Sequence, residues 1–205
     1  MLFENQGNFT FKDVADQAKV ADFEFSWGAV FEDFNLDGKQ DLAVAENYVA
    51  FPPHALFKLP CRFLIQREGG VFAAVEEQAG VVNKNYGISP LVSDFNNDGF
   101  PDMLYANLNG PFKAWASEGG SNNYIAVKFP ETAEYVGTRI SVETESGKTA
   151  SEFYVIGEGL GSDQTNVLTI GLGAEKSVKS LSIDYPSGKK ETISQPEINK
   201  VHQLK

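Results

Sequence analysis

Two nine-residue segments place oxygen-bearing side chains at the same fixed spacing. Residues 33–41 and residues 94–102 both read D-x-N-x-D-G-x-x-D. Oxygen-bearing side chains stand at positions 1, 3, 5 and 9, and a glycine stands at position 6. A short loop that wraps a hard cation must present oxygens at alternate residues and turn sharply between them. The spacing therefore predicts a calcium-binding loop in each copy.

Each loop offers side-chain oxygens and, at position 7, one backbone carbonyl. The expected ligands are Asp33, Asn35, Asp37, Asp41 and the carbonyl of Lys39 in the first loop, and Asp94, Asn96, Asp98, Asp102 and the carbonyl of Phe100 in the second. Magnesium fits less well, because this smaller ion keeps several of its waters and takes fewer protein oxygens. We expect two Ca²⁺ ions with a structural role.

Two other interpretations of the loops are weaker. Asp, Asn and Gly also form plain β-turns, but a turn needs only one or two such residues. Each loop holds three carboxylates within nine positions, and their repulsion without a cation would raise their pKa values and cost stability. An ordinary EF-hand is excluded because position 12 is Val44 or Tyr105 instead of glutamate, and because the flanking sequence does not predict helices.

Short runs of β-forming residues flank both loops. They cover residues 29–31 and 42–45 around the first loop, and residues 91–92 and 103–105 around the second. Such runs predict that each loop joins two antiparallel strands. The loops recur at a shift of 61 residues, and a Gln-Ala-x-Val segment that precedes each loop recurs at the same shift. The chain therefore contains an internal repeat of blade-sized units.

Aromatic residues outside the loops favour packing roles. Trp27 and Tyr86 hold corresponding repeat positions, which indicates core packing. The proline-rich segment at residues 48–60 is expected to cover the open edge of the first blade through Phe51, Leu56 and Phe57. The alternative is a partner-binding surface. His54 in this segment is expected to be a solvent or packing residue.

Beyond residue 120 aspartates become rare and β-type alternation becomes regular, which predicts a domain boundary near that residue. We expect residues 1–120 to form two repeats, about 1–61 and 62–120, and residues 121–205 to form a separate β domain. Ser-Gly pairs at residues 146–147 and 187–188 are typical of hairpin turns. Closely spaced strands predict a small sandwich or barrel. The expected strands are residues 124–129, 137–144, 149–155, 167–170, 178–185, 191–194 and 201–204.

Composition excludes several classes of function. The formal net charge of −11 disfavours a nucleic-acid partner, which needs a basic face. No apolar run is long enough to predict a membrane span, and the first residues do not form a signal peptide. Cys61 is the only cysteine, so no intrachain disulfide is possible. With two histidines and no acid pair outside the loops, we expect no catalytic residues.

Taken together, these motifs resemble known families. The two loops, each preceded by an aromatic-Gly step and a Gln-Ala-x-Val segment, resemble the FG-GAP or VCBS-type repeats of calcium-bearing β-propellers. Residues 123–127, 136–139, 170–173 and 185–188 resemble the ASPIC/UnbV domain that follows such repeats in the cartilage acidic protein family. The resemblance implies an extracellular or periplasmic setting, calcium dependence, and binding instead of catalysis.

The sequence thus predicts an all-β protein with two propeller-type blades that carry calcium loops, followed by a β-sandwich or barrel-like domain. The expected function is a calcium-stabilised extracellular binding or adhesion module, with an unknown protein or glycan ligand. The alternatives are an accessory fragment of a carbohydrate-processing or other secreted enzyme, and a purely architectural propeller fragment. Because a closed propeller takes four or more blades, open edges also make self-association an expectation.

Overall fold

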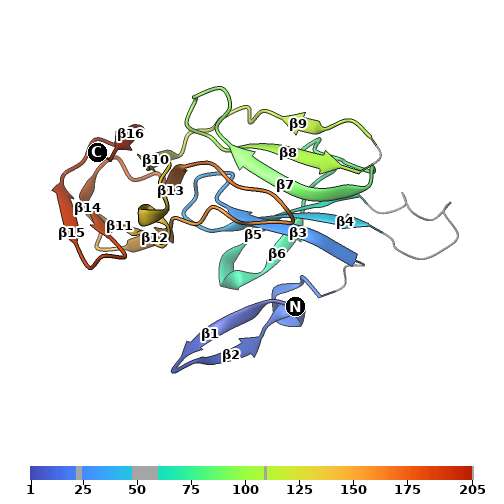
Figure 1. The fold of residues 1–205 in the computed structure, drawn as a ribbon, viewed down its shortest axis with the longest axis horizontal. Coiled ribbons are helices and arrows are strands. Elements are labelled where there is room, and N and C mark those ends of the chain that lie inside the picture. Colours follow the sequence, from blue (N-terminus) through green and yellow to red (C-terminus); the bar gives the residue numbers. More distant parts are fainter. Residues whose placement is uncertain (22–24, 48–59, 109, 205) are drawn as a thin grey trace, which may run out of the picture. The chain divides into compact units, whose positions relative to one another are not determined.

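The computed structural model describes residues 1–21, 25–47, 60–108 and 110–204, and these residues are built mainly of β-strands (Figure 1). Most neighbouring strands pair antiparallel, which confirms the all-β fold class. Within these ranges the one α-helix, α1 (Ala15–Ala18), is a single turn. No helix in the described part of the chain is long and apolar enough to cross a membrane.

The strands around the first loop form a four-stranded sheet in sequence order. The strands are β3 (Phe25–Glu32), β4 (Asp41–Asn47), β5 (Arg62–Gln66) and β6 (Phe72–Ala74). Each pairs antiparallel with the next, which is the connectivity of a propeller blade. Leu42, Val44, Leu64 and Phe72 from three of these strands share one buried cluster. The apolar residues that predicted these strands therefore form the core of the sheet.

The strands around the second loop form a three-stranded sheet, again in sequence order. The strands are β7 (Gly87–Ser93), β8 (Asp102–Asn107) and β9 (Lys113–Trp115). A separate hairpin, β1 (Phe3–Gly7) with β2 (Thr10–Asp13), precedes both sheets in the sequence. The first loop joins β3 to β4, and the second joins β7 to β8. The expected strand-to-strand placement of both loops is thus confirmed.

Equivalent backbone hydrogen bonds recur at the 61-residue shift seen in the sequence. Ala18 N donates to Val14 O, and Ala79 N, 61 residues later, donates to Val75 O, both at 2.8 Å. The next bonds along each turn repeat at the same shift. The two Gln-Ala-x-Val segments therefore share one local structure, a helical turn after a β-strand.

Two sheets enclose the core of the C-terminal part. One has the order β13 (Val167–Gly173), β10 (Asn123–Lys128), β16 (Val201–Gln203), and the other has the order β12 (Thr149–Phe153), β11 (Arg139–Thr144), β14 (Val178–Asp184), β15 (Lys190–Ser194). Alternate residues of both sheets, among them Ile125, Ile140 and Leu181, meet in one cluster without solvent exposure. This arrangement is sandwich-like. All seven expected strands are present, with ends that differ by at most three residues.

The chain divides into two compact units whose segments alternate along the sequence. One comprises Met1–Glu32, Gln40–Pro90 and Leu104–Lys113, and the other comprises Asp33–Lys39, Leu91–Met103 and Ala114–Lys205. The second unit thus holds positions 1–7 of the first loop, all of the second loop and the C-terminal sheets. The boundary near residue 120 stays a prediction. The expected roles of Phe51, His54, Leu56 and Phe57 fall on residues 48–59, outside the described ranges.

Candidate metal centre

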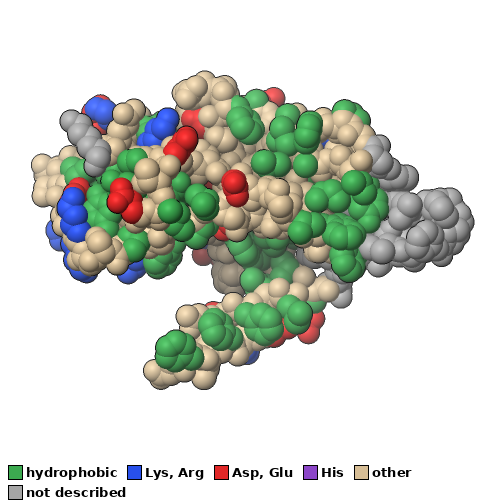
Figure 2. Space-filling view, in the orientation of Figure 1, with side chains coloured by type: hydrophobic (Ala, Val, Ile, Leu, Met, Phe, Trp, Pro, Cys, Tyr) green, Lys and Arg blue, Asp and Glu red, His purple; other side chains and the backbone are tan. Residues whose placement is uncertain are grey.

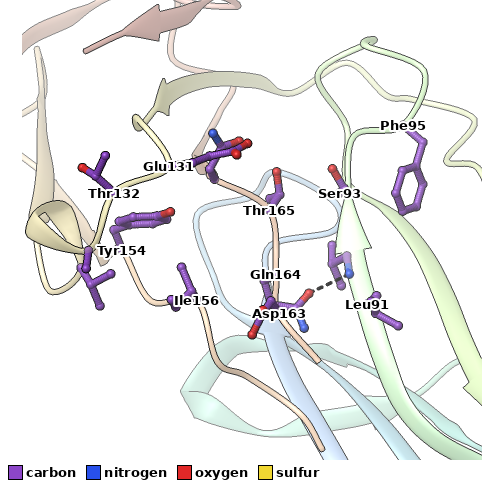
Figure 3. A pocket seen from close by; sticks show the side chains of 14 residues that line it. Leu91, Ser93, Phe95, Glu131, Thr132, Tyr154, Ile156, Asp163, Gln164 and Thr165 are labelled. Carbon is purple, nitrogen blue, oxygen red and sulfur yellow. Dashed lines mark hydrogen bonds between the residues drawn. The ribbon is translucent and has the colours of Figure 1, made fainter. Parts of the chain in front are cut away.

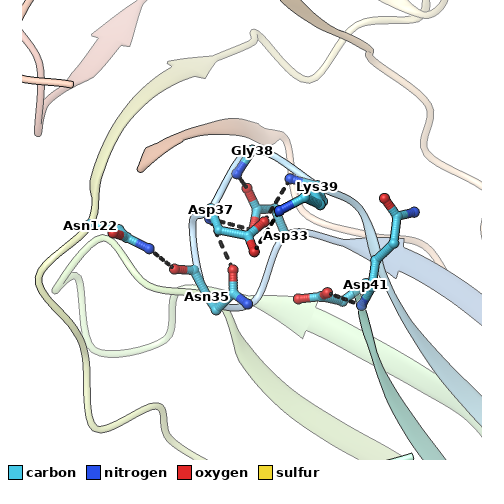
Figure 4. A network of polar contacts seen from close by, with 8 residues as sticks. Asp33, Asn35, Asp37, Gly38, Lys39, Asp41 and Asn122 are labelled. Atoms are coloured by element: carbon cyan, nitrogen blue, oxygen red, sulfur yellow. Dashed lines mark hydrogen bonds and ion pairs between the residues drawn. The ribbon is translucent and has the colours of Figure 1, made fainter. Parts of the chain in front are cut away.

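The first loop is organised by hydrogen bonds from its own backbone to its acidic and amide side chains (Figure 4). Asp33 accepts from Asp37 N through Oδ1, at 3.0 Å, and from Gly38 N through Oδ2, at 2.7 Å. Asn35 Oδ1 also accepts from Asp37 N, at 2.9 Å, and Asp37 Oδ1 accepts from Lys39 N, at 2.9 Å. These four bonds hold the side chains of positions 1, 3 and 5 inside the turn.

The second loop repeats the same four hydrogen bonds. Asp94 accepts from Asp98 N at 3.1 Å and from Gly99 N at 2.8 Å. Asn96 Oδ1 accepts from Asp98 N at 2.9 Å, and Asp98 Oδ1 accepts from Phe100 N at 2.8 Å. The pairing of donors and acceptors matches position by position. The motif therefore determines the local geometry of the loop in both copies.

The position-9 aspartates also accept hydrogen bonds from backbone N–H groups, in the third strand of the first sheet and just beyond the third strand of the second. Asp41 Oδ1 accepts from Gln66 N at 2.8 Å, and Asp102 Oδ1 accepts from Ser117 N at 2.7 Å. Asp102 Oδ2 reaches back to the second position of its own loop, where Phe95 N donates at 2.8 Å. Both aspartates are buried. Their role as metal ligands stays a prediction, and the structure adds a second role, that of a bridge between backbone segments.

Backbone conformation explains the residues at positions 4 and 6. Gly38 and Gly99 have φ of 87° and 90°, in the region that favours glycine. Position 4 is also left-handed, with φ of 57° at Leu36 and 60° at Asn97. Asparagine adopts this conformation readily, whereas leucine does so rarely. Leu36 is fully buried, and that burial offsets the strain of its backbone.

The first loop packs against β13. A Cβ at Gly171 would overlap the Asp33 carboxylate and would lie 2.6 Å from Leu36 Cα, so only glycine fits there. Gly173 N donates to Leu36 O at 2.8 Å. Asn122 Nδ2 donates to Asn35 O at 2.9 Å. The first loop therefore packs against residues 171–173, the Gly-Leu-Gly segment of β13.

The second loop meets β10 through one aromatic ring. A side chain at Gly99 would overlap the ring of Tyr124. Burial raises the pKa of Tyr124, and the nearby charges of Asp94 and Asp98 raise it further. The rest of this loop is open, because Asn96, Asn97 and Asp98 are exposed to solvent. The two loops thus share their internal bonds and differ in their surroundings.

The electrostatics of the first loop favour a nearby cation. Asp33 is 2% exposed, and burial raises the pKa of its carboxyl to about 6 even though three backbone N–H groups lower it. The charge of Asp37 raises it further. Lys39 Nζ lies 3.4 Å from Asp37 Oδ2 and offsets part of this negative charge. Burial and the charge of Asp37 both disfavour the ionised form of Asp33, and a cation bound nearby would favour that form.

The residues present fit a hard cation at positions 1, 3 and 5. A carboxylate has about four lone-pair sites, so an oxygen that accepts one N–H keeps capacity for a metal. The described residues hold no group of three or more His, Cys, Asp or Glu side chains gathered as a metal site. The hydrogen bonds account for this, since the position-9 carboxylates turn toward backbone donors and position 3 is an asparagine. Calcium binding by the ten expected ligands stays a prediction.

Several other residues singled out from the sequence have clear surroundings. The rings of Trp27 and Tyr86 lie 6.0 Å apart between centroids, so the two repeat-related aromatics contact each other. Cys61 is buried, and burial raises the pKa of its thiol to about 11. A ring nitrogen of His202 lies 2.8 Å from the carbonyl of Glu197.

Sequence reasoning did not find the contacts that the loops make. Nothing in the spacing of the loops pointed to Asn122, Tyr124 or Gly171. In the sequence, the Gly-Leu-Gly segment indicates only a family resemblance. In the structure, its first glycine, Gly171, packs against Asp33 and Leu36. A second signal was the leucine at position 4 of the first loop, where the second loop has asparagine. An apolar residue in an acidic loop indicates that this loop is buried against another element.

Comparison with known proteins supports part of the family resemblance. Comparison with curated proteins yields no match. The resemblance of the N-terminal part to the FG-GAP or VCBS-type repeats stays a prediction. The C-terminal segment, residues 130–205, matches the family model of the ASPIC and UnbV domain.

Proposed function

We propose that the chain is a calcium-stabilised extracellular binding or adhesion module without catalytic activity of its own. One observation carries this proposal: both loops make the same four hydrogen bonds, which hold the oxygen-bearing side chains of positions 1, 3 and 5 within one turn. Two calcium ions, one in each loop, would offset the charge of these side chains. Each ion would then tie together the two strands that its loop connects.

The position of the loops gives the ions a structural role. The first loop lies against Gly171 and Gly173, and the second lies against Tyr124. An ion that stiffens a loop would therefore also stiffen its contact with the C-terminal strands. Calcium would stabilise the packing within the second compact unit as well as the turn itself.

The surroundings of the reactive side chains support a binding role. Cys61 is buried, and its raised thiol pKa leaves little thiolate at neutral pH. Buried cysteines of this kind are inert. The proposed extracellular setting rests on the family resemblance. Extracellular calcium modules commonly bind with dissociation constants on the order of 10⁻⁴ to 10⁻³ M.

Thermal melting with calcium and with chelator tests this proposal. At a free calcium concentration of about 100 times Kd, one site contributes about 2.7 kcal/mol. For a chain of this length that corresponds to a rise in Tm of roughly 5–10 °C per site. Magnesium at the same concentration should give a smaller rise. An identical Tm in calcium and in chelator would contradict the proposal.

One observation favours the architectural alternative. All nine strand residues of the β1–β2 hairpin are exposed, and Phe3 and Phe11 of the strands form an apolar surface on it together with Phe9 of the turn (Figure 2). An isolated two-stranded hairpin is marginally stable in water, so a partner that covers it would stabilise it. If the chain serves only as part of a larger propeller, it should dimerise in chelator as readily as in calcium.

A further inference from the structure

A cavity of about 520 Å³ lies within the second compact unit, and its lining includes Phe95, position 2 of the second loop (Figure 3). It lies between the end of β7 and two irregular segments of the C-terminal part, residues 131–136 and 154–166. This volume is typical of sites for small organic molecules. The cavity therefore has the size of a ligand site.

The Gln164 side chain links two of the segments that line the cavity. Gln164 Oε1 accepts from Val92 N on β7 at 2.9 Å, and Gln164 Nε2 donates to Glu158 O at 3.2 Å. These bonds tie the segment that follows β12 to the edge of β7. Two of the segments that line the cavity are thus joined by a hydrogen bond between Gln164 and Val92.

The hydroxyl of a largely buried tyrosine faces the cavity. Tyr154 is 4% exposed, and its ring stacks on Phe129 with centroids 4.3 Å apart and an interplanar angle of 1°. Its hydroxyl is directed toward the cavity. In the part of the chain that the structure describes, this hydroxyl makes no hydrogen bond. This hydroxyl can donate one hydrogen bond and accept others, so a ligand in the cavity can bond to it in place of solvent.

The charged groups of the cavity are all acidic. Glu131 and Asp163 line it, and its lining contains no Lys, Arg or His among the described residues. Neither carboxylate forms an ion pair within those residues. The charge of Glu131 contributes to a raised pKa of Tyr154, after burial as the main cause. An anionic ligand is therefore disfavoured, and a cationic one is favoured.

The apolar part of the lining argues against a bare metal ion. Leu91 and Val136 line the cavity, and Phe95 and Ile156 do so with 56% and 41% of their surface exposed. A hydrated inorganic cation would leave these groups in contact with water. An aliphatic ligand would cover them, and a cation near an aromatic ring such as Phe95 gains additional attraction.

We propose that this cavity binds a small organic cation, namely a primary amine on a short aliphatic chain. The ammonium group lies between Glu131 and Asp163 and donates one hydrogen bond to the Tyr154 hydroxyl. The aliphatic chain lies against Phe95 and Ile156. Glu131, Tyr154 and Asp163, which bind the ammonium group, lie outside the two loops, whereas Phe95 belongs to the second loop.

Titration of the full chain with three matched probes tests the charge requirement. Pentylamine, 1-pentanol and pentanoate share one aliphatic body and differ in charge at pH 7. Amide ¹H–¹⁵N shifts recorded in excess calcium report where each probe binds. We expect pentylamine to shift the amides of residues 91–95 and 154–166, and the other two probes to bind at least about tenfold more weakly, which is 1.4 kcal/mol.

Single substitutions locate the ammonium group. Glu131→Gln and Asp163→Asn should each weaken pentylamine binding by about threefold to fivefold, the size expected for partly exposed ion pairs. Glu134→Gln, in the same exposed segment but outside the cavity lining, should leave it unchanged. Tyr154→Phe should also weaken the amine, while leaving 1-pentanol less affected.

Four outcomes would overturn the proposal. The first is equal binding of pentylamine and 1-pentanol, and the second is an amine affinity that is unchanged in both Glu131→Gln and Asp163→Asn. The third is displacement of the amine when calcium is raised tenfold. The fourth is the absence of amide shifts with any of the three probes. The third outcome would assign the carboxylates to an inorganic cation. The amine titration is recorded in excess calcium and its substitutions lie outside the loops, so failure of one test leaves the other intact.

Discussion

The first and second loops have the same motif and the same internal hydrogen bonds, yet they lie in different surroundings. Asp33 and Leu36 of the first loop are buried, and Gly171 leaves no space beside them. In the second loop Asn97 and Asp98 face solvent. The motif thus sets the local geometry, whereas the neighbouring strand sets the energetic cost of the charges.

This difference predicts unequal roles for the two proposed ions. The Asp33 carboxylate has lost water and carries a raised pKa, so a cation there would relieve a large desolvation cost. The Asp98 carboxylate stays in contact with water, which already stabilises its charge. We therefore expect the first site to couple more strongly to folding stability and the second to act more locally.

The largest effect is expected from adding a side chain at Gly171, because that side chain would fill space that the first loop occupies. Gly171→Ala places a Cβ into the Asp33 carboxylate and 2.6 Å from Leu36 Cα, so the loop must move. Such overpacking should cost about 3 kcal/mol or more and lower Tm by roughly 6–12 °C in a melting experiment. Gly157→Ala is the matched control, because nothing lies within 4 Å of a Cβ there. Equal Tm values for the two variants would show that the first loop is not packed against β13.

A smaller effect is expected from pH in the presence of chelator. Asp33 has a folded pKa of about 6 against an ordinary value of 3.8, so the folded state holds its proton more tightly than the unfolded state. Its contribution to stability is therefore present below about pH 4 and is lost as pH rises through 6. The loss amounts to about 3 kcal/mol at 1.36 kcal/mol per pKa unit.

Urea denaturation between pH 4 and pH 7 measures this effect, with Asp33→Asn as the variant that cannot titrate. The wild-type chain should lose more stability across this window than the variant does. Saturating calcium should remove most of the difference, because a bound cation favours the carboxylate. The same pH dependence in both proteins would mean that Asp33 has an ordinary pKa.

Much of the fold could be predicted from the sequence because local patterns determine it. The alternation at Ile140 and Val142 identifies β11, and both residues are buried in the core cluster. The Ser-Gly pairs at residues 146–147 and 187–188 lie at hairpin turns, where Gly147 and Gly188 have φ of 82° and 85°. Strands and turns of this kind depend on neighbours in sequence, so they can be inferred without knowledge of the tertiary structure.

Contacts between distant segments could not be predicted. β13 runs to Gly173 instead of ending at residue 170, and the first loop packs against these added residues. The bonds of Asp41 to Gln66 and of Asp102 to Ser117 depend on sheet pairing, and their sequence separations of 25 and 15 residues differ between the copies. The cavity beside Tyr154 likewise depends on how residues 131–136 and 154–166 pack against β7. Spacing within a motif does not specify such contacts.

Calorimetric titration of calcium into the wild-type chain, Asp37→Ala and Asp98→Ala tests the central claim most directly. We expect two ions per wild-type chain and one per variant, with the larger loss of calcium-dependent stability in Asp37→Ala. Asp16→Ala, an exposed aspartate outside the loops, should keep both ions. Equal loss at both sites in one variant would show that the loops act as one cooperative unit. No calcium binding by the wild-type chain, or two ions in every variant, would contradict the account.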